Sequence, residues 1–243
     1  ANFSPNLTKS RKDSPNCSKF LPKIREFRVC DGRRGCLILL STMDQASTGG
    51  FLVVLSGPAG SGKTTLAERA CQAFASLERV VTATTRDPRA GEVDGRDYHF
   101  LSVDDFEARI NTGAFYEWAK VHGRYYGTLK AEVDVKLAQG LDLLLVIDVQ
   151  GAASLREASA GTGTLRGNVV TVFLEPASID QLRERLRERG SDDELEIAAR
   201  VETAYYELQR ANEFDERITT GTKDEDFAAF AALYERLKAG RQA

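Results

Sequence analysis

The residues of this chain best suited to chemistry form a glycine-rich segment that ends in a lysine and two hydroxyl groups. The segment is Gly57-Pro58-Ala59-Gly60-Ser61-Gly62-Lys63-Thr64-Thr65. Glycines allow backbone conformations that a β-carbon would block, so successive N–H groups can turn inward around an anion. In such a loop the lysine reaches the β- and γ-phosphates of a nucleotide, and the next hydroxyl holds Mg²⁺. The spacing predicts a nucleoside triphosphate site with Lys63 on the phosphates and Thr64 on the metal.

The segments on both sides of this loop are those that a phosphate loop requires. The apolar run 51–55 has the length of a buried strand, and residues 65–70 open a helix. The helix adds the positive end of its dipole to the same place. A glycine-rich turn that binds nothing is the alternative, and the strand–loop–helix context argues against it.

A second polar segment, residues 84–100, combines arginines with turn-forming residues. Its proline and its two glycines exclude a long helix. Arg86 and Arg89 lie shortly after a short strand expected over 79–83, and Tyr98 follows them. Because a guanidinium group matches phosphate oxygens bidentately, the pattern indicates a phosphate site. A solvated loop with incidental arginines is the alternative.

Two acids stand at positions that suggest a site. Glu117 lies among aromatic residues in the alternating run 114–121, which is typical of a strand. Asp148 follows the apolar run 141–147, which is typical of a buried parallel strand. An acid at the carboxyl end of a central strand can hold Mg²⁺ and its waters in a phosphate-loop protein. A helix-capping role fits Asp148 equally well from the pattern alone.

The remaining patterns alternate between helix and strand. Helices are expected from the phosphate loop to about Leu77, over about 129–139 and after Ser178, and strands over 169–174 and near 217–219. Ser178 and Gln181 have the spacing of a capping box. The alternation predicts an α/β fold with a doubly wound, mostly parallel sheet, without internal repeats or a second core.

The composition limits the class of protein. The chain has 243 residues, 42% of them hydrophobic and 28% charged, as in ordinary globular proteins. A net charge of −3 argues weakly against a general nucleic-acid binder. No apolar run approaches the roughly 20 residues of a membrane span. The four cysteines form no C-x-x-C pair, so we interpret them as free thiols and expect a reducing, cytoplasmic location.

Residues 1–42 differ from the rest of the chain. They carry nine Lys or Arg and three acids, a net charge of +6, which leaves −9 for the remainder. Met43 is the only methionine and begins a short polar lead-in to the first strand. The favoured interpretation is that Met43 is the initiator and that 1–42 are spurious or dispensable. A disordered extension and a targeting segment are the alternatives.

Taken together, five motifs closely resemble those of the guanylate kinases. They are the phosphate loop, T-T-R-x-P-R-x-G-E-x-x-G-x-D-Y-x-F over 84–100, F-x-E-W over 115–118, Y-Y-G-T over 125–128 and I-D-V-Q-G over 147–151. Their order and spacing agree with the family over about residues 51–238. The resemblance implies phosphoryl transfer from Mg-ATP to GMP, and to dGMP as well, for guanine nucleotide supply and GMP recycling.

The resemblance also implies a fold and a division of the chain. The fold is a P-loop three-layer α/β fold with a parallel central sheet, an NMP-binding region and a helical lid. The kinase domain would span 43–243, with the NMP-binding region over about 82–130 and the lid over about 185–205. The expected partners are the small molecules GMP, dGMP and ATP, rather than nucleic acid or a membrane, for a monomer or homodimer.

Individual site residues follow from the same resemblance. The GMP phosphate and base fall on Arg86, Arg89, Tyr98, Tyr126, Glu117, Thr82, Thr128 and Asp148. Guanine presents N1–H and N2–H₂ side by side to the carboxylate of Glu117, whereas N1 of adenine is an acceptor. The lid arginines Arg185, Arg189 and Arg200 would close over the phosphates and neutralise transition-state charge. Mg²⁺ falls on Thr64 and Asp148, partly through water.

Two positions depart from the family pattern, and two other functions stay open. Val146 stands where many relatives carry an acid, and Ile218 to Thr222 replace an element with an Asn near adenine, so looser ATP base contacts are expected. One alternative is an inactive scaffold domain, although such domains lose the loop lysine or the arginines, which are present here. The other is a relative that phosphorylates another nucleotide or a ribosyl phosphate.

Overall fold

The computed structural model describes residues 49–121, 123–190 and 193–242, without the side chains of Arg189 and Gln242. The expectations for residues 1–42 lie outside the described residues. None of the helices in the described part of the chain is both long enough and apolar enough to cross a membrane.

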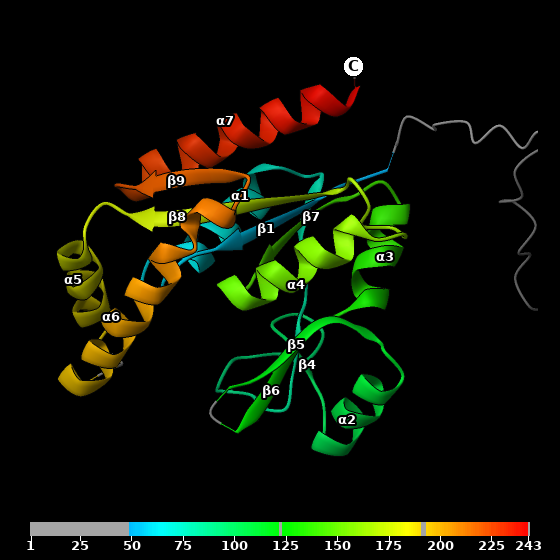
Figure 1. The fold of residues 1–243 in the computed structure, drawn as a ribbon, viewed down its shortest axis with the longest axis horizontal. Helices are drawn as coiled ribbons and strands as arrows, with labels where there is room; N and C mark the ends of the chain where they lie inside the picture. Colours follow the sequence, from blue (N-terminus) through cyan, green and yellow to red (C-terminus); the bar gives the residue numbers. More distant parts are fainter. Residues whose placement is uncertain (1–48, 122, 191–192, 243) are drawn as a thin grey trace, which may run out of the picture. The chain divides into compact units, whose positions relative to one another are not determined.

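Strands and helices alternate along most of the described chain (Figure 1). The strands are β1 (Leu52–Ser56), β2 (Leu77–Arg79), β3 (Ala83–Thr84), β4 (His99–Phe100), β5 (Phe115–Val121), β6 (Arg124–Leu129), β7 (Asp142–Val146), β8 (Val169–Pro176) and β9 (Glu216–Thr220). The helices are α1 (Lys63–Ala73), α2 (Val103–Asn111), α3 (Lys130–Ala138), α4 (Val149–Ala160), α5 (Ile179–Arg189), α6 (Glu194–Gln209) and α7 (Lys223–Gln242), with a 3₁₀ turn at Ala211–Glu213.

The larger sheet is parallel and has β1 at its centre. Its five strands follow the order β2-β7-β1-β8-β9, and every neighbouring pair is parallel. The carboxyl ends of these strands therefore meet at one edge, where open α/β sheets bind their ligands. This arrangement confirms the predicted fold class and brings the ends of β1, β7, β8 and β9 together.

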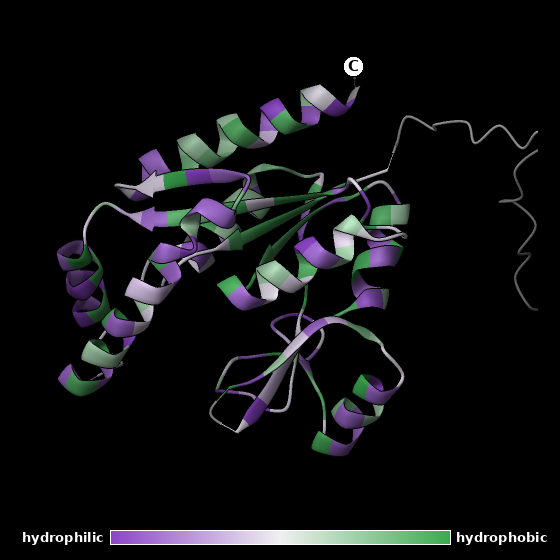
Figure 2. Cartoon of the chain, viewed as in Figure 1, coloured by the Kyte–Doolittle hydropathy of each residue, from purple (hydrophilic) through white to green (hydrophobic). Residues whose placement is uncertain are grey.

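Alternate residues of β1 enter two cores on opposite faces of this sheet. Val53 and Leu55 pack with α1 and α7, whereas Leu52 and Val54 pack with α3 and α4. Figure 1 shows α7 on one side of the sheet and α3 and α4 on the other. In Figure 2 the central strands β1 and β7 between these helices are strongly hydrophobic, as strands covered on both faces require.

A second, four-stranded sheet has the order β4-β3-β6-β5. β3 is parallel to β4 and antiparallel to β6, which is antiparallel to β5. The expectation of no second core is wrong, because Ala83, Phe106, Phe115 and Leu129 form a separate buried cluster. The Phe106 ring lies 4.4 Å from that of Phe115, centre to centre. This core is assembled from short, separate segments, so no long apolar run marks it in the sequence.

The junction between the two sheets corrects two boundaries. The single strand expected over 79–83 is divided: β2 pairs with β7 in the large sheet, and β3 pairs with β4 and β6 in the small one. Helix α1 ends at Ala73 rather than near Leu77, because Phe74 is already extended (φ −113°, ψ 102°) and Leu77 begins β2.

Helices α5 and α6 form a pair with its own apolar contact. Their buried residues are Leu182, Leu186, Ile197, Val201 and Ala204. The Ser178 hydroxyl caps α5 by accepting from the N–H of Gln181 (3.1 Å), as predicted. The Gln181 side chain accepts from Ala177 instead of Ser178, so this capping box is only half formed. A complete box, Asp193 with Glu196, begins α6.

Candidate active site

The glycine-rich loop leaves β1 at the carboxyl edge of the large sheet. Gly57, Gly60 and Gly62 have φ values of 139°, 87° and 97°, which side chains with a β-carbon rarely adopt. A β-carbon on Gly57 would also lie 2.4 Å from the carbonyl oxygen of Leu174 in β8. The loop conformation therefore depends on glycine.

Lys63 begins α1 and folds back over this loop. Its Nζ donates hydrogen bonds to the carbonyl oxygens of Gly57 (2.5 Å) and Pro58 (2.9 Å). Burial lowers the pKa of Lys63 to about 8, and the negative charges of Glu207 and Asp148 oppose that effect. The ammonium group is thus held inside the loop, where a triphosphate would lie.

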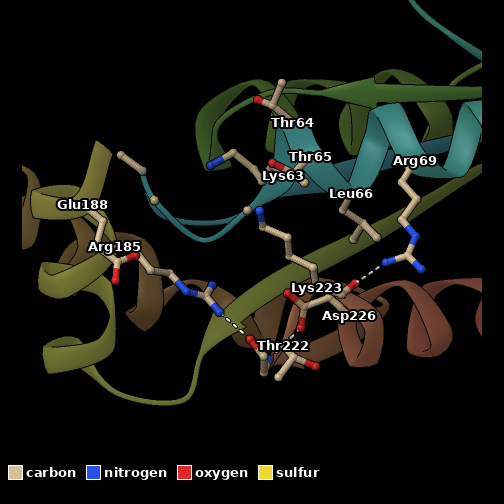
Figure 3. Close-up of a pocket in the computed structure, with 14 residues that line it drawn as sticks. Lys63, Thr64, Thr65, Leu66, Arg69, Arg185, Glu188, Thr222, Lys223 and Asp226 are labelled. Carbon is tan, nitrogen blue, oxygen red and sulfur yellow. Dashed lines mark hydrogen bonds between the residues drawn. The ribbon is translucent and has the colours of Figure 1, made fainter. Parts of the chain in front are cut away.

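A cavity of about 750 Å³ lies beside the loop. It is lined by the loop, the first turns of α1, residues of α5 and the turn between β9 and α7. Figure 3 shows Lys223 extending from the start of α7 toward the first turn of α1. The Ser61 hydroxyl is buried without a hydrogen-bond partner among the described residues, so it retains a donor for an anion bound in the loop.

Arg185 connects α5 to both walls of this cavity. Its guanidinium group donates to the carbonyl oxygens of Ser61 (3.4 Å) and Gly221 (2.5 Å) and to the hydroxyl of Thr220 (3.3 Å). Figure 3 shows the side chain reaching across toward the β9–α7 turn. Thr220 belongs to the element that departs from the family pattern, and its hydroxyl accepts a bond from this arginine.

Helix α5 also contacts the loop through an apolar side chain. A β-carbon on Gly60 would lie 3.1 Å from Cδ2 of Leu186. Of the two other arginines expected in this region, Arg200 is half-buried on α6, and Arg189 ends α5 with a side chain outside the described residues. The structure therefore brings Arg185 to the loop, and the roles of Arg189 and Arg200 stay predictions.

The arginines expected at the acceptor phosphate follow β3. The Arg86 guanidinium group donates to both carboxylate oxygens of Glu92, at 2.8 and 2.9 Å, and these bonds raise its pKa. The Arg86 Cζ lies 5.6 Å from the centre of the Tyr98 ring, which meets the Tyr126 ring edge-on at 6.4 Å. The N–H of Arg89 also donates to Glu92 (2.7 Å). The two arginines therefore share one acid, and Tyr98 lies between Arg86 and Tyr126.

Glu117 and Thr128 face each other across β5 and β6. The Thr128 hydroxyl donates to Oε1 of Glu117 at 2.5 Å. The strand register shifts between Phe115 and Glu117, and such bulges re-aim a side chain. Burial raises the pKa of Glu117, and the hydrogen bond from Thr128 offsets part of that rise. A partly buried carboxylate of this kind favours a ligand that supplies N–H donors.

Asp148 follows β7 and caps α4. Its Oδ1 accepts from the N–H groups of Gln150 (3.0 Å) and Gly151 (2.8 Å), so the capping interpretation is confirmed. Because both bonds use Oδ1, the cap leaves Oδ2 for another partner. Gly151 lets α4 approach β5 closely, since a β-carbon there would lie 3.2 Å from Oε2 of Glu117. Asp148 and Glu117 thus belong to one site.

A small cavity of about 80 Å³ joins the two halves of the site. It is lined by Thr64, Arg79, Val80, Thr82, Tyr98 and Val146. Thr64 also lines the large cavity beside the loop. Thr64 of the loop and Tyr98 beside Arg86 therefore line one cavity. Val146 presents an apolar side chain to this cavity.

Three charged residues of the site have no role that could be predicted from their sequence positions. Glu92 orients Arg86, although it is visible only as one letter of a motif. Arg79 lines the small cavity. Glu207 on α6 is only 8% exposed, and burial raises its pKa to about 7. In the sequence, Glu207 could be recognised as the one charged residue among apolar residues at helical spacing, which are Ile197, Val201 and Ala204.

A phosphate loop follows the central strand of the large sheet, a second small sheet carries tyrosines with two arginines in the segment after β3, and a helix pair reaches back to the loop. This organisation can hold two phosphorylated ligands end to end, as transfer of a phosphoryl group between them requires. It is the organisation of a P-loop nucleoside monophosphate kinase.

Comparison with known proteins defines the family. A family model described as guanylate kinase matches residues 50–236. The guanylate kinase of Nitratidesulfovibrio vulgaris is 46% identical over 186 residues, which are 76% of this chain and 86% of the relative. That of Chlorobium luteolum is 45% identical over 176 residues, 72% of this chain and 86% of the relative. The crystal structure of guanylate kinase from Anaplasma phagocytophilum matches with a TM-score of 0.60 at 28% identity, covering 81% of this chain and 88% of that one. The chain belongs to the guanylate kinase family, enzymes that phosphorylate GMP to GDP with ATP.

Proposed function

We propose that this enzyme transfers the γ-phosphoryl group of Mg-ATP to GMP and also to dGMP, for guanine nucleotide supply and GMP recycling. The hydrogen-bonded pair of Glu117 and Thr128 carries the choice of base. Guanine offers two adjacent donors to the carboxylate, whereas adenine would turn an acceptor toward it. dGMP is included because the proposed contacts are made to the phosphate and the base, so no 2′-hydroxyl is needed.

On the acceptor side, two cations and two phenols suit a phosphate dianion. The proposed ligands of the GMP phosphate are Arg86, Arg89, Tyr98 and Tyr126. A guanidinium group has five N–H donors, and the bonds of Arg86 to Glu92 and to the Asp87 carbonyl leave donors for the phosphate. Thr82 and Asp148 lie beside the base with the Glu117–Thr128 pair.

On the donor side, the backbone N–H groups of the loop surround the ATP phosphates. The proposed ATP-binding residues are Gly57, Pro58, Ala59, Gly60, Ser61, Gly62, Lys63, Thr64 and Thr65. The unpartnered hydroxyl of Ser61 and the inward ammonium group of Lys63 support this assignment. The large cavity beside the loop has room for the nucleoside.

The residues present fit Mg²⁺, which prefers oxygen ligands and usually retains waters. Thr64 offers an exposed hydroxyl, and Asp148 has a carboxylate oxygen outside its capping bonds. Among the described residues, no group of three or more His, Cys, Asp or Glu forms a metal centre by itself. This agrees with a metal that arrives with ATP and is held partly through water. When bound, Mg²⁺ supplies neutralisation of charge on the phosphate oxygens.

Catalysis in this proposal rests on positioning and electrostatics, so no general base is required. The proposed catalytic residues are Lys63, Arg185, Arg189 and Arg200, which neutralise charge that develops on the transferred group. Closure of a lid over about 185–205 onto an NMP-binding region over about 82–130 would exclude water and suppress ATP hydrolysis. Both regions lie in a kinase domain that we place over 43–243.

A coupled assay of ADP release tests the proposal. The acceptors are GMP, dGMP, AMP, UMP and dTMP at saturating Mg-ATP. We expect dGMP to be used within about ten-fold of GMP in kcat/KM, and AMP to be worse by roughly 10⁴-fold. Equal use of AMP or of a pyrimidine nucleotide would contradict the proposed acceptor.

A further inference from the structure

Tyr116 is the extra residue of a bulge in β5. The pairing of β5 with β6 passes from Phe115 opposite Leu129 directly to Glu117 opposite Thr128, so two steps along β5 correspond to one step along β6. Side chains of a regular strand alternate between the two faces of a sheet. An extra residue interrupts this alternation and can turn two neighbouring side chains to the same face.

The residues on either side of the bulge show this interruption. The Phe115 ring stacks on that of Phe106 in α2, with 4.4 Å between the ring centres. The Trp118 ring meets that of Tyr125 edge-on at 5.9 Å, and Tyr125 itself stacks on Phe106 at 5.2 Å. Phe115 and Trp118 therefore share the face that α2 covers, although residues three apart in a regular strand point to opposite faces.

Tyr116 and Glu117, the two residues between them, are directed to helices of the large sheet. Tyr116 packs against the core that β1 forms with α3 and α4. Helix α4 lies against β5 (Figure 1), and a β-carbon on Gly151 of α4 would lie 3.2 Å from Oε2 of Glu117. The bulge thus turns an aromatic side chain and the acid assigned to the base the same way.

Helix α3 holds both the ring and the hydroxyl of Tyr116. The hydroxyl donates a hydrogen bond to Oδ1 of Asp134, and the ammonium group of Lys130 lies 5.7 Å from the ring centre. Lys130 and Asp134 are four residues apart, on one face of α3. Val133 and Leu137 of the same helix are buried in the core of the large sheet. The bulged residue is therefore attached to a helix that is itself anchored on the large sheet.

We propose that Tyr116 is a positioning residue for base selection: its hydrogen bond to Asp134 fixes the bulge, and the bulge holds the carboxylate of Glu117 at the guanine base. The inference rests on the proposed function, because it takes Glu117 as the residue that selects the base. Thr128 orients one oxygen of this carboxylate from β6, whereas Tyr116 fixes the β5 backbone that carries it.

A purely structural role for Tyr116 is the competing explanation, because an aromatic side chain that packs on a core stabilises the fold in any case. A structural role predicts that loss of the hydroxyl lowers the melting temperature without changing base selection, or weakens the use of both substrates alike. A positioning role predicts a loss that is confined to the acceptor nucleotide and is specific for guanine.

The first test compares Tyr116→Phe, which removes only the hydroxyl, with Tyr205→Phe, the same change at an exposed position of α6. In Tyr116→Phe we expect kcat/KM for GMP to fall about five-fold or more, mainly through a higher KM for GMP. KM for ATP should stay within about two-fold of the wild type. The use of AMP should not fall, so the preference for GMP over AMP decreases. Tyr205→Phe should match the wild type.

The acceptor of the hydrogen bond is tested at Asp134. Asp134→Ala removes the acceptor and should reproduce the loss of Tyr116→Phe, whereas Asp134→Asn keeps an oxygen that can accept and should retain more of the wild-type efficiency. Thermal melting of each variant shows whether the fold is intact. Wild-type use of GMP by Tyr116→Phe or by Asp134→Ala overturns the proposal. Lower melting combined with a raised KM for both substrates also overturns it.

A double-mutant cycle tests whether Tyr116 acts through Glu117. In a Glu117→Gln background, Tyr116→Phe should lower kcat/KM for GMP by less than about two-fold, because the group that it positions is already lost. The same loss in both backgrounds would overturn the proposal. A wild type without preference for GMP over AMP would count against the proposed function, whereas a wild type that prefers GMP but tolerates Tyr116→Phe would count only against the positioning role.

Discussion

The hydroxyl of Thr128 donates a hydrogen bond of 2.5 Å to Oε1 of Glu117, across the antiparallel pair β5 and β6. The other carboxylate oxygen, Oε2, faces the first turn of α4 at Gly151. The carboxylate that we assign to the base is therefore oriented by a strand neighbour and bounded by a helix of the large sheet. Its position depends on the register between the two strands.

Thr128→Val tests this arrangement, because it removes the hydroxyl and keeps a branched side chain. The carboxylate of Glu117 would lose its fixed orientation, and the pKa of Glu117 would rise because the bond that lowers it is absent. We expect kcat/KM for GMP to fall about ten-fold. Thr203→Val, at an exposed position of α6, is the control and should have no effect. Unchanged use of GMP by Thr128→Val would show that the hydroxyl is not needed.

Lys63→Ala tests the phosphate loop. The fold should persist, since burial of this ammonium group is unfavourable, as its lowered pKa indicates. Turnover should fall on the order of 10³-fold or more, because a cation on the transferred phosphoryl group is lost. The measurements are kcat at saturating Mg-ATP and GMP and the melting temperature. Near-normal turnover in a folded variant would refute the assignment.

Arg189→Ala tests the lid. We expect kcat to fall much more than KM for GMP rises, because the arginine should act on charge that develops in the transition state. Arg183→Ala, at a solvent-facing residue paired with Asp180 on the same helix, is the matched control and should be neutral. Loss of GMP affinity with kcat intact would place Arg189 in ground-state binding instead.

Glu207→Gln has a predicted effect on stability that depends on pH. Burial raises the carboxyl pKa from 4.5 to about 7 in the folded protein, so the folded state binds the proton more tightly. The contribution of this residue to stability is then complete below about pH 4.5 and is lost as the pH rises through about 7. The melting temperature of Glu207→Gln minus that of the wild type should therefore increase between about pH 5 and about pH 8. A difference that is independent of pH would contradict the burial of a charged carboxylate.

The parts of the site that lie in contiguous motifs could be predicted from the sequence. The phosphate loop and the segment around Arg86 carry their chemistry in residue types a few positions apart. The interpretation of Asp148 stayed open between cap and metal ligand, and the structure shows that capping uses only one oxygen. Local spacing thus identified the chemical groups but not their hydrogen-bond partners.

The sheet boundary and Glu207 could not be predicted because both depend on contacts between distant segments. The β-branched run 79–83 favours one strand, but the chain crosses there from β2 in one sheet to β3 in the other. Glu207 lies in a helix with many exposed charged residues, and only its burial in the folded protein distinguishes it from them. Helical periodicity gives the face of a residue, whereas the burial of Glu207 is known only from the fold.

The central claim is that Glu117 makes this site specific for guanine. The most direct measurement is kcat/KM for GMP and for AMP, in the wild type and in Glu117→Gln, at saturating Mg-ATP. We predict that the wild type prefers GMP by up to roughly 10⁴-fold and that Glu117→Gln loses most of this preference by losing GMP, since an amide offers one acceptor where two are needed. Wild-type efficiency on GMP in Glu117→Gln, or equal use of AMP and GMP by the wild type, would contradict the claim.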